Sequence, residues 1–277
     1  MPGAVEPIAV VLTCYRYGAW AAECLESLAA QTLAPSEVLI VDDGSDDDSP
    51  AVLRALERRF AAHLPLRVEL APHRGAAQAL RTAIDGTTAP WLVNVDIDDV
   101  VRPRFLEALA HALAAHPDAG YAWPRMRLIG DETGQYLTHR FSAGRLLFHG
   151  NYIPNVALMR RAAYLETPGH RDLLTHIDWD LWLSFLDAGW PGVLVDEELY
   201  LWRRHAGSLS TRPPSVRFRA RREVLAHHRR LALRHAASAV PWTAAAVGRR
   251  VRQRLPERYR GTTRLTPSGW IVAGPNR

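Results

Sequence analysis

Three aspartates at the end of one apolar run are the residues of this chain whose types and spacing most strongly suggest chemistry. The segment Trp91–Asp99 reads as a buried strand that ends in the carboxylates of Asp96, Asp98 and Asp99. Like charges about 4 Å apart repel by about 4 kcal/mol at an effective dielectric near 20, so converging carboxylates need a cation. Oxygen ligands favour Mg²⁺ or Mn²⁺. The alternative is a solvated turn with helix-capping aspartates.

The elements around this cluster are predicted to alternate between strands and helices. Apolar runs at 8–14, 37–41 and 66–70 predict strands, and 19–31, 50–62 and 76–85 predict the helices that follow them. With the strand at Trp91, this order predicts an α/β fold whose parallel sheet has right-handed crossovers. Ligands of such sheets bind beyond the carboxyl ends of the strands, so the polar loops there should gather around the aspartates.

Composition excludes several classes of protein. The chain has 277 residues, 48% of them hydrophobic, which suits one large domain with an appendage. All 34 basic residues are arginine, so P-loop, pyridoxal and Ser-Lys mechanisms lack their lysine. The motifs G-x-G-x-x-G, G-x-S-x-G and H-E-x-x-H are absent. Two cysteines, no signal peptide and no long apolar span predict a cytoplasmic protein without disulfides or a zinc site.

Five ordered motifs lie within about residues 7–211. They are Thr13-Cys14-Tyr15, Val41-Asp42-Asp43-Gly44-Ser45, Asp96-Ile97-Asp98-Asp99 followed by Pro103, His176-Ile177-Asp178-Trp179-Asp180-Leu181-Trp182, and Arg203-Arg204-His205-Ala206-Gly207-Ser208-Leu209-Ser210. Together they resemble the nucleotide-sugar-dependent glycosyltransferases of family two. The resemblance implies a GT-A fold, a Rossmann-like, mostly parallel sheet with flanking helices. It also implies a catalytic domain over 1–211, with a donor half (1–118) and an acceptor half (119–211).

The resemblance assigns donor-binding roles to residues at the strand ends. Thr13 and Tyr15 would hold a nucleobase and ribose with a hydroxyl and an aromatic face. Asp43 would accept the imino N–H of uracil or thymine, which implies a UDP- or dTDP-sugar, although an Asp-Gly-Ser segment can also be only a turn. His73 and Arg74 would contact the donor from the third loop, where the family often has asparagine.

The same resemblance implies a metal site. Asp98 would face the donor ribose or the ion, Asp99 would bind the ion that bridges the two phosphates, and Asp96 would either bind it or support its ligands. His205 would add a nitrogen ligand or touch the phosphates, although a histidine among arginines can also be a surface residue. Mg²⁺ or Mn²⁺ would stabilise the charge that grows on the departing diphosphate.

The general base is predicted to be Asp178. Transfer to a hydroxyl needs a carboxylate that removes the acceptor proton. Asp178 matches the aspartate of the family's Glu-Asp signature, although Ile177 replaces the glutamate, and the start of a helix favours its ionised form. A role as helix cap is compatible with catalysis. Asp180 is the rival base, but two residues along a helix it should point elsewhere. The resemblance implies an inverting, one-step displacement.

Residues 119–175 are expected to form the acceptor side, for a saccharide, a lipid-linked or a natural-product acceptor. Aromatic and polar side chains there could stack on or hydrogen-bond a hydroxylated acceptor, although most should be core or loop residues. These candidates are Tyr121, Trp123, Tyr136, His139, Phe148, Asn151, Tyr152 and Asn155.

A basic segment follows Ser210. Residues 212–264 hold 15 arginines against Glu223 and Glu257, a net charge of +13. Since the whole chain has a net charge of +5, the remainder has a net charge of −8. Residues 216–235 and 242–255 predict two helices, and 261–277 a loose tail. We expect this extension to pack on the acidic domain of its own or a partner chain, as in a homodimer, in preference to a peripheral contact with a membrane. No nucleic-acid motif accompanies the charge, so no nucleic-acid partner is expected.

Two other functions fit part of the pattern. A nucleotidyltransferase that makes activated sugars would share the sheet and the metal carboxylates, but it would show a glycine-rich phosphate loop near the first strand, which is absent here. A non-catalytic protein that binds a sugar nucleotide would tolerate Asp178→Asn with a change in stability alone.

Overall fold

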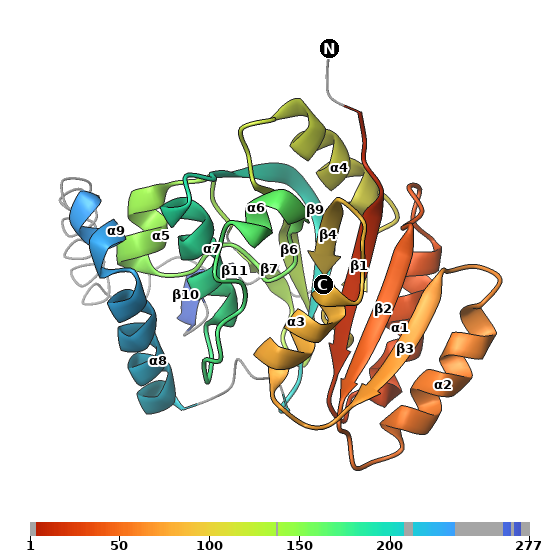
Figure 1. Ribbon diagram of the computed structural model, residues 1–277. Helices are drawn as coiled ribbons and strands as arrows, with labels where there is room; N and C mark the ends of the chain where they lie inside the picture. The colour runs from red at the N-terminus through yellow and green to blue at the C-terminus, as the bar shows by residue number, and fades with distance from the viewer. Residues whose placement is uncertain (1–3, 137, 208–212, 236–262, 267–268, 273–277) are drawn as a thin grey trace.

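The first half of the molecule alternates strands and helices (Figure 1). The computed structural model describes residues 4–136, 138–207, 213–235, 263–266 and 269–272. The elements of this half are β1 (Ile8–Cys14), α1 (Gly18–Ala29), β2 (Glu37–Asp43), α2 (Ser49–Phe60), β3 (Leu66–Ala71), α3 (Ala76–Asp85) and β4 (Trp91–Asn94). The strands pair in parallel in the order β3-β2-β1-β4. The predicted parallel sheet and its three crossover helices are confirmed.

The second half extends the same sheet mainly with antiparallel strands. Its elements are β5 (Val100–Val101), α4 (Phe105–Ala115), β6 (Tyr121–Gly130), β7 (Gly134–Tyr136), α5 (Ala143–His149), β8 (Leu158–Arg160), α6 (Arg161–Leu165), α7 (Ile177–Asp187) and β9 (Gly192–Arg204). Strand β8 runs antiparallel to β4 and β6, β9 runs parallel to β6, and β5 pairs with the distal part of β9. This last pairing brings the end of β9 to the loop after β4.

Helices cover both faces of the central strands. Along β1, Val10 and Leu12 are buried in a cluster with α1, α2 and α4, whereas Ala9 and Val11 are buried in a second cluster with α3 and α7. Successive strand side chains point to opposite faces, so a strand buried on both sides must be apolar throughout. That is why this segment reads as an unbroken apolar run. Cys14 and Cys24 are buried free thiols.

The basic extension packs beside α7 as helices α8 (Pro214–His227) and α9 (Arg229–Arg234). The single helix predicted over 216–235 is therefore interrupted at His228, whose side chain is 2% exposed. The second predicted helix, 242–255, lies outside the described residues. Part of the predicted loose tail is instead a hairpin of β10 (Thr263–Thr266) and β11 (Gly269–Val272), and β11 pairs with β7. Among the described helices, none is both long and apolar enough to cross a bilayer.

Candidate active site

The carboxyl ends of β1 and β2 bring the first two predicted motifs together. Thr13 is in register with Val41, and Cys14 with Asp42. The carboxylate of Asp42 accepts the hydroxyl of Ser45 at 2.6 Å and its backbone N–H at 2.9 Å, which closes the turn after β2. Thr13 is half-buried at the strand end. Parallel register thus gathers these loops at one edge of the sheet, as predicted.

The side chain of Asp43 holds the loop between β3 and α3 in place. Its carboxylate is 4% exposed and accepts the backbone N–H groups of Arg74 at 2.8 Å and Gly75 at 2.9 Å. Nδ1 of His73 lies 2.9 Å from the same carboxylate. The loop approaches β2 so closely that a Cβ on Gly44, whose φ is +69°, would lie 2.5 Å from the backbone nitrogen of His73. The side chain of Arg74 is exposed.

Tyr15 and His73 form an aromatic stack at the mouth of the sheet. Their ring centroids are 4.3 Å apart with an interplanar angle of 25°. The guanidinium of Arg16 lies 5.1 Å from the centroid of the Tyr15 ring, and its Nε and Nη2 contact the carboxylate of Asp46 at 2.5 Å. Tyr15 is 38% exposed, which makes it one of the exposed aromatic side chains in the described part of the chain.

The loop after β4 meets the end of β9 through Asp98 and His205. Nε2 of His205 lies 2.9 Å from Oδ2 of Asp98. Nε of Arg203 donates to the backbone carbonyl of Asp98 at 2.8 Å. The ring of Tyr17 stands edge-on to His205 at 5.3 Å, and its hydroxyl donates to the carbonyl of Gly207 at 2.7 Å. The side chains of Asp98 and His205 are 14% and 17% exposed, so they remain reachable from outside.

Asp99 is turned into the protein. Its side chain is 1% exposed, and its two carboxylate oxygens accept from the hydroxyl of Tyr200 and from the backbone N–H of Arg203, the latter at 2.6 Å. Burial, reinforced by the negative charges of Asp98 and Asp96, raises the pKa of Asp99 well above its ordinary value. Asp99 therefore joins the loop after β4 to β9.

Asp96 is held by two asparagines and feels the charges of both Asp98 and Asp178. Its carboxylate accepts from Nδ2 of Asn155 at 3.0 Å and from Nδ2 of Asn94 at 3.5 Å. Burial raises the pKa of Asp96 to about 7, and the charges of Asp98 and Asp178 add to the effect. Because the charge of Asp178 raises the pKa of Asp96, Asp178 lies within electrostatic reach of the aspartates that follow β4. Asp178 comes from a different part of the chain, the start of α7.

Asp178 is the second residue of α7. Its Oδ2 accepts from Nδ2 of Asn151 at 2.6 Å, and its Oδ1 accepts the backbone N–H of Trp179 at 2.8 Å. The residue before the helix, His176, has a φ of +65°. Burial raises the pKa of Asp178 to about 6, against these hydrogen bonds, which lower it. A carboxyl with this pKa is ionised at neutral pH and is a stronger base than an exposed aspartate.

Asp180, the rival base, is part of a different cluster. It is fully buried and accepts from Nη1 of Arg171 at 2.7 Å, while Nε2 of His228 lies 3.0 Å away. Burial raises the pKa of Asp180, but the hydrogen bonds from His228 and Arg171 outweigh burial and leave the pKa below its ordinary value. The helix thus separates the two aspartates: Asp178 faces Asn151, and Asp180 faces the extension.

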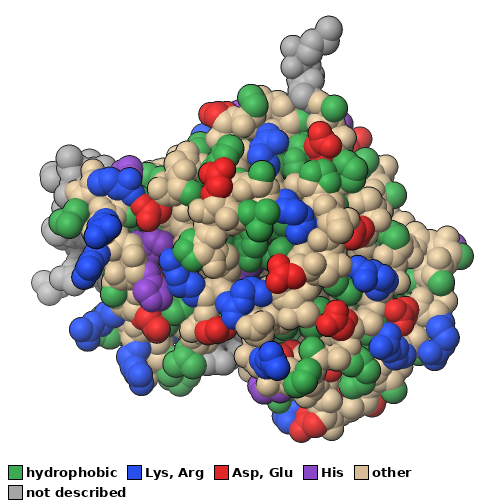
Figure 2. Space-filling model, in the orientation of Figure 1, with side chains coloured by type: hydrophobic (Ala, Val, Ile, Leu, Met, Phe, Trp, Pro, Cys, Tyr) green, Lys and Arg blue, Asp and Glu red, His purple; other side chains and the backbone are tan. Residues whose placement is uncertain are grey.

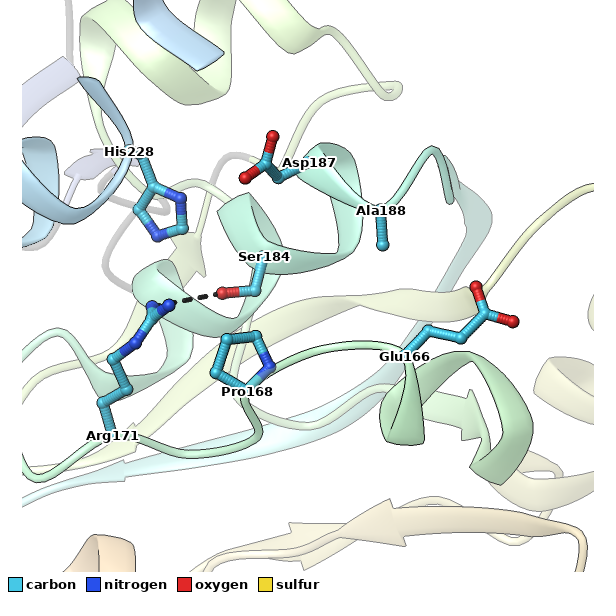
Figure 3. Close-up of a pocket in the computed structure, with 7 residues that line it drawn as sticks. All are labelled: Glu166, Pro168, Arg171, Ser184, Asp187, Ala188 and His228. Atoms are coloured by element: carbon cyan, nitrogen blue, oxygen red, sulfur yellow. Dashed lines mark hydrogen bonds between the residues drawn. The ribbon is translucent and has the colours of Figure 1, made fainter. Parts of the chain in front are cut away.

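A cavity of about 240 Å³ lies beside this second cluster (Figure 3). Arg171 and Ser184 point toward each other across it, joined by a hydrogen bond of 3.3 Å, and His228 faces them from the extension. None of the predicted site residues lines this cavity. The candidate active site is therefore defined by the carboxylates at the strand ends.

The acceptor-side candidates divide into two groups. Asn151 and Asn155 hold the carboxylates of Asp178 and Asp96. Tyr121 and Trp123 are core residues with no exposed surface, Tyr136 and Tyr152 are also buried, and His139 and Phe148 are half-buried. Tyr17 and Tyr200 were not predicted, because a tyrosine in a turn or an alternating strand carries no spacing signal that points to the site. Arg203 belongs to one of the predicted motifs but was given no role of its own.

No group of three or more His, Cys, Asp or Glu side chains in the described part of the chain is arranged to hold a metal ion by itself. Asp98 and His205 are the pair of predicted metal ligands that the structure brings within 2.9 Å of each other. An oxygen and a nitrogen ligand on two side chains suit an ion that takes its other ligands from phosphates and water.

Comparison with known proteins places these features in a family. The profile of Glycosyl transferase family 2 matches residues 9–171. The chain is 26% identical over 215 residues to the putative glycosyltransferase EpsE of Bacillus subtilis, covering 74% of this chain and 76% of that one.

Two solved structures share the fold. One is S. aureus TarS 1–349 in complex with UDP-GlcNAc, with a TM-score of 0.61, 18% identity and coverage of 75% of this chain and 61% of that one. The other is the mannosyltransferase PcManGT from Pyrobaculum calidifontis in complex with GDP-Man and Mn²⁺, with a TM-score of 0.60, 18% identity and coverage of 94% and 83%. With its GT-A fold and its family 2 profile, the chain belongs to glycosyl transferase family 2 and is a glycosyltransferase.

Proposed function

We propose that this glycosyltransferase moves a sugar from a nucleoside diphosphate sugar to a hydroxyl of a saccharide, lipid-linked or natural-product acceptor, with Asp178 as the general base. The observation that carries the proposal is the position of Asp178 at the start of α7, with its pKa raised to about 6 and its charge within reach of Asp96. A base must act on the acceptor side of the donor, opposite the leaving diphosphate. Asp178 comes from the acceptor half and Asp98 from the donor half.

The residues at the strand ends fit a divalent cation, Mg²⁺ or Mn²⁺. We propose Asp98 and His205 as its protein ligands, because their side chains already lie 2.9 Å apart and are partly exposed. This revises the role proposed for Asp99, whose oxygens accept from Tyr200 and Arg203. Asp96 would then support the site through Asn155. When bound, the ion supplies positive charge to the diphosphate that leaves. The Mn²⁺ in the PcManGT structure supports a divalent cation as the cofactor.

The donor is proposed to enter along β1 and β2. Tyr15 offers an aromatic face, and the backbone at Asp43 and Arg74 offers polar edges beside it. The structures of TarS with UDP-GlcNAc and of PcManGT with GDP-Man support a nucleotide-sugar donor. We keep a UDP- or dTDP-sugar as the proposed donor, with Asp43 reading the base while it holds the third loop. Thr13 and His73 would border the same site.

With Asp178 as the single proposed base, we propose a single displacement with inversion at the anomeric carbon, as the family resemblance implies. In this proposal Asn151 holds Oδ2 of Asp178, which leaves the remaining lone pairs of the carboxylate to receive the acceptor proton. Proton magnetic resonance of the first product formed gives the anomeric configuration. The opposite configuration to that of the donor is expected, and retention would refute the single-base mechanism.

A screen of nucleotide sugars tests the proposed function. The wild-type protein is incubated with UDP-, dTDP- and GDP-sugars and Mn²⁺, and release of the nucleoside diphosphate is measured with and without EDTA. We expect turnover of at least one donor that EDTA abolishes and that Asp178→Asn removes while binding of UDP or dTDP persists. Equal turnover by the wild type and Asp178→Asn would favour a different base. Binding without turnover in any acceptor mixture would favour a non-catalytic binding protein.

A further inference from the structure

The extension formed by α8 and α9 uses one of its faces to bind the catalytic domain. Val224 and Leu231 are buried in the same core cluster as Trp179 of α7. The guanidinium of Arg221 lies 5.2 Å from the ring centroid of Trp179. Nε2 of His228 contacts Asp180 at 3.0 Å. This inner face therefore already provides the packing on the domain that the sequence predicted for the basic segment.

The opposite face carries two large apolar side chains that the domain does not cover. Phe218 is 63% exposed and Leu233 is 75% exposed. Exposed residues recur at helical spacing between them, at Arg222, Ala226 and Arg229. The two helices meet at His228, whose N–H donates to the carbonyl of Val224 at 3.2 Å at the end of α8 and whose carbonyl accepts the N–H of Ala232 at 2.9 Å at the start of α9. Phe218 on α8 and Leu233 on α9 are therefore both on the solvent-exposed side of the extension.

Unpaired positive charge surrounds these apolar side chains. Arg219, Arg222, Arg229 and Arg230 are exposed, and no carboxylate in the described chain forms an ion pair with them. Glu223 is the one acidic residue in the sequence between positions 213 and 235. Figure 2 shows basic side chains gathered along the edge of the molecule that α8 and α9 form. The outer face, defined by Phe218, Arg219, Arg222, Arg229, Arg230 and Leu233, is both cationic and apolar.

We propose that this outer face binds the surface of an anionic lipid bilayer. Exposed apolar side chains on a basic helix can enter the boundary between headgroups and acyl chains while the arginines meet lipid phosphates. A second copy of the chain would bring like charges against each other across the same face, which opposes a symmetric dimer there. A nucleic acid offers phosphates but no apolar phase for Leu233. The proposal concerns binding and does not depend on the identity of the donor or acceptor.

Co-sedimentation with vesicles tests the proposal. The full-length protein is mixed with phosphatidylcholine vesicles, with and without phosphatidylglycerol, over a series of salt concentrations. Binding is expected with the anionic vesicles alone and should weaken as salt rises, because screening reduces the attraction of the arginines. The double variant Phe218→Ser/Leu233→Ser should weaken the partition coefficient by about tenfold or more. The pair Arg222→Gln/Arg229→Gln should weaken it by about 25-fold, at about fivefold for each arginine.

Matched substitutions elsewhere on the surface serve as controls. Leu165 and Leu174 are 69% and 57% exposed on other elements, so Leu165→Ser/Leu174→Ser removes comparable apolar surface. Arg58→Gln/Arg140→Gln removes two other exposed arginines. Both control pairs should bind like the wild type, and thermal denaturation of every variant shows whether it is folded.

Four results would overturn the proposal. The first is absence of binding to anionic vesicles by the folded wild type. The second is equal binding by the outer-face variants and their controls. The third is light scattering that shows a dimer which Phe218→Ser/Leu233→Ser dissociates, because the outer face would then be an interface between copies. Binding of a DNA duplex that outcompetes vesicles and is insensitive to the apolar substitutions would likewise assign the face to polyanions in general.

Discussion

His205 and Asp98 lie side by side at the mouth of the sheet, with Nε2 of the histidine 2.9 Å from Oδ2 of the aspartate, although 107 positions separate them in the chain. The pairing of β5 with β9 produces this proximity, because it carries the end of β9 across the loop that follows β4. In the proposed function, the diphosphate of the donor would lie at this contact.

This relationship predicts a metal-dependent loss of affinity. Asp98→Asn and His205→Ala should each weaken binding of UDP in the presence of Mn²⁺ by about tenfold or more, because each removes one ligand of the ion. Isothermal titration with and without EDTA measures the effect. The variants in Mn²⁺ should approach the affinity of the wild type in EDTA. Affinities in Mn²⁺ that match the wild type would contradict the assignment.

Asp99 should behave differently from Asp98. Asp99→Asn leaves the hydroxyl of Tyr200 and the N–H of Arg203 with a poorer acceptor, and loss of a buried hydrogen-bond partner costs about 1–3 kcal/mol. A lower free energy of unfolding in urea is therefore expected, with the Mn²⁺ dependence of UDP binding retained by the folded fraction. If Asp99→Asn is as stable as the wild type but no longer responds to Mn²⁺, Asp99 is a ligand of the ion.

Tyr15 should contribute a stacking face for the nucleobase. Stacking of a base on an aromatic side chain is worth about 1–3 kcal/mol, so Tyr15→Ala should weaken UDP binding by about fivefold or more. Tyr15→Phe keeps the face and should bind like the wild type. Measuring both UDP and ribose diphosphate separates the contribution of the base from that of the phosphates. Tyr15→Ala should weaken binding of UDP and leave binding of ribose diphosphate unchanged. Unchanged UDP affinity in Tyr15→Ala would place the base elsewhere.

Asp180 should matter for stability and not for proton transfer. Asp180→Asn leaves the guanidinium of Arg171 without its buried carboxylate partner, which costs about 3 kcal/mol or more. The lowered pKa of Asp180 means that its contribution is present above the ordinary aspartate pKa and is lost as pH falls through the folded value. Asp187→Asn is the matched control, because it breaks an exposed ion pair with Arg234 of the same extension, worth at most about 1 kcal/mol. Equal urea midpoints for the two variants would contradict this account.

The sequence was sufficient for much of the fold because strands buried on both faces leave unbroken apolar runs. The strand at Ile8–Cys14 and the helix at Ala76–Asp85 were predicted with the boundaries that the structure shows. The interruption at His228 and the hairpin of β10 and β11 were not predicted. The interruption depends on the contact of His228 with Asp180, and the hairpin depends on the pairing of β11 with β7. The local spacing of residues does not predict such tertiary contacts.

The site was predictable at the level of motifs and less so at the level of individual side chains. Motif order brought Asp98, His205 and Asp178 into the candidate list, but three adjacent carboxylates at a strand end look alike in sequence. The direction of each depends on its partners: Tyr200 draws Asp99 inward, whereas Asn155 holds Asp96. Both partners lie more than 50 residues away in the chain, so the division of roles became visible in the structure alone.

The central claim, that Asp178 removes the acceptor proton, is tested most directly by the turnover number of Asp178→Asn beside the pH profile of the wild type. The account predicts that kcat of the variant falls by about 100-fold to 10,000-fold while UDP affinity is kept. It also predicts that wild-type kcat/KM rises with pH to a plateau above about 6, because the base acts when deprotonated. A variant with wild-type kcat, or a wild-type kcat/KM that falls as pH rises through 6, would contradict the claim.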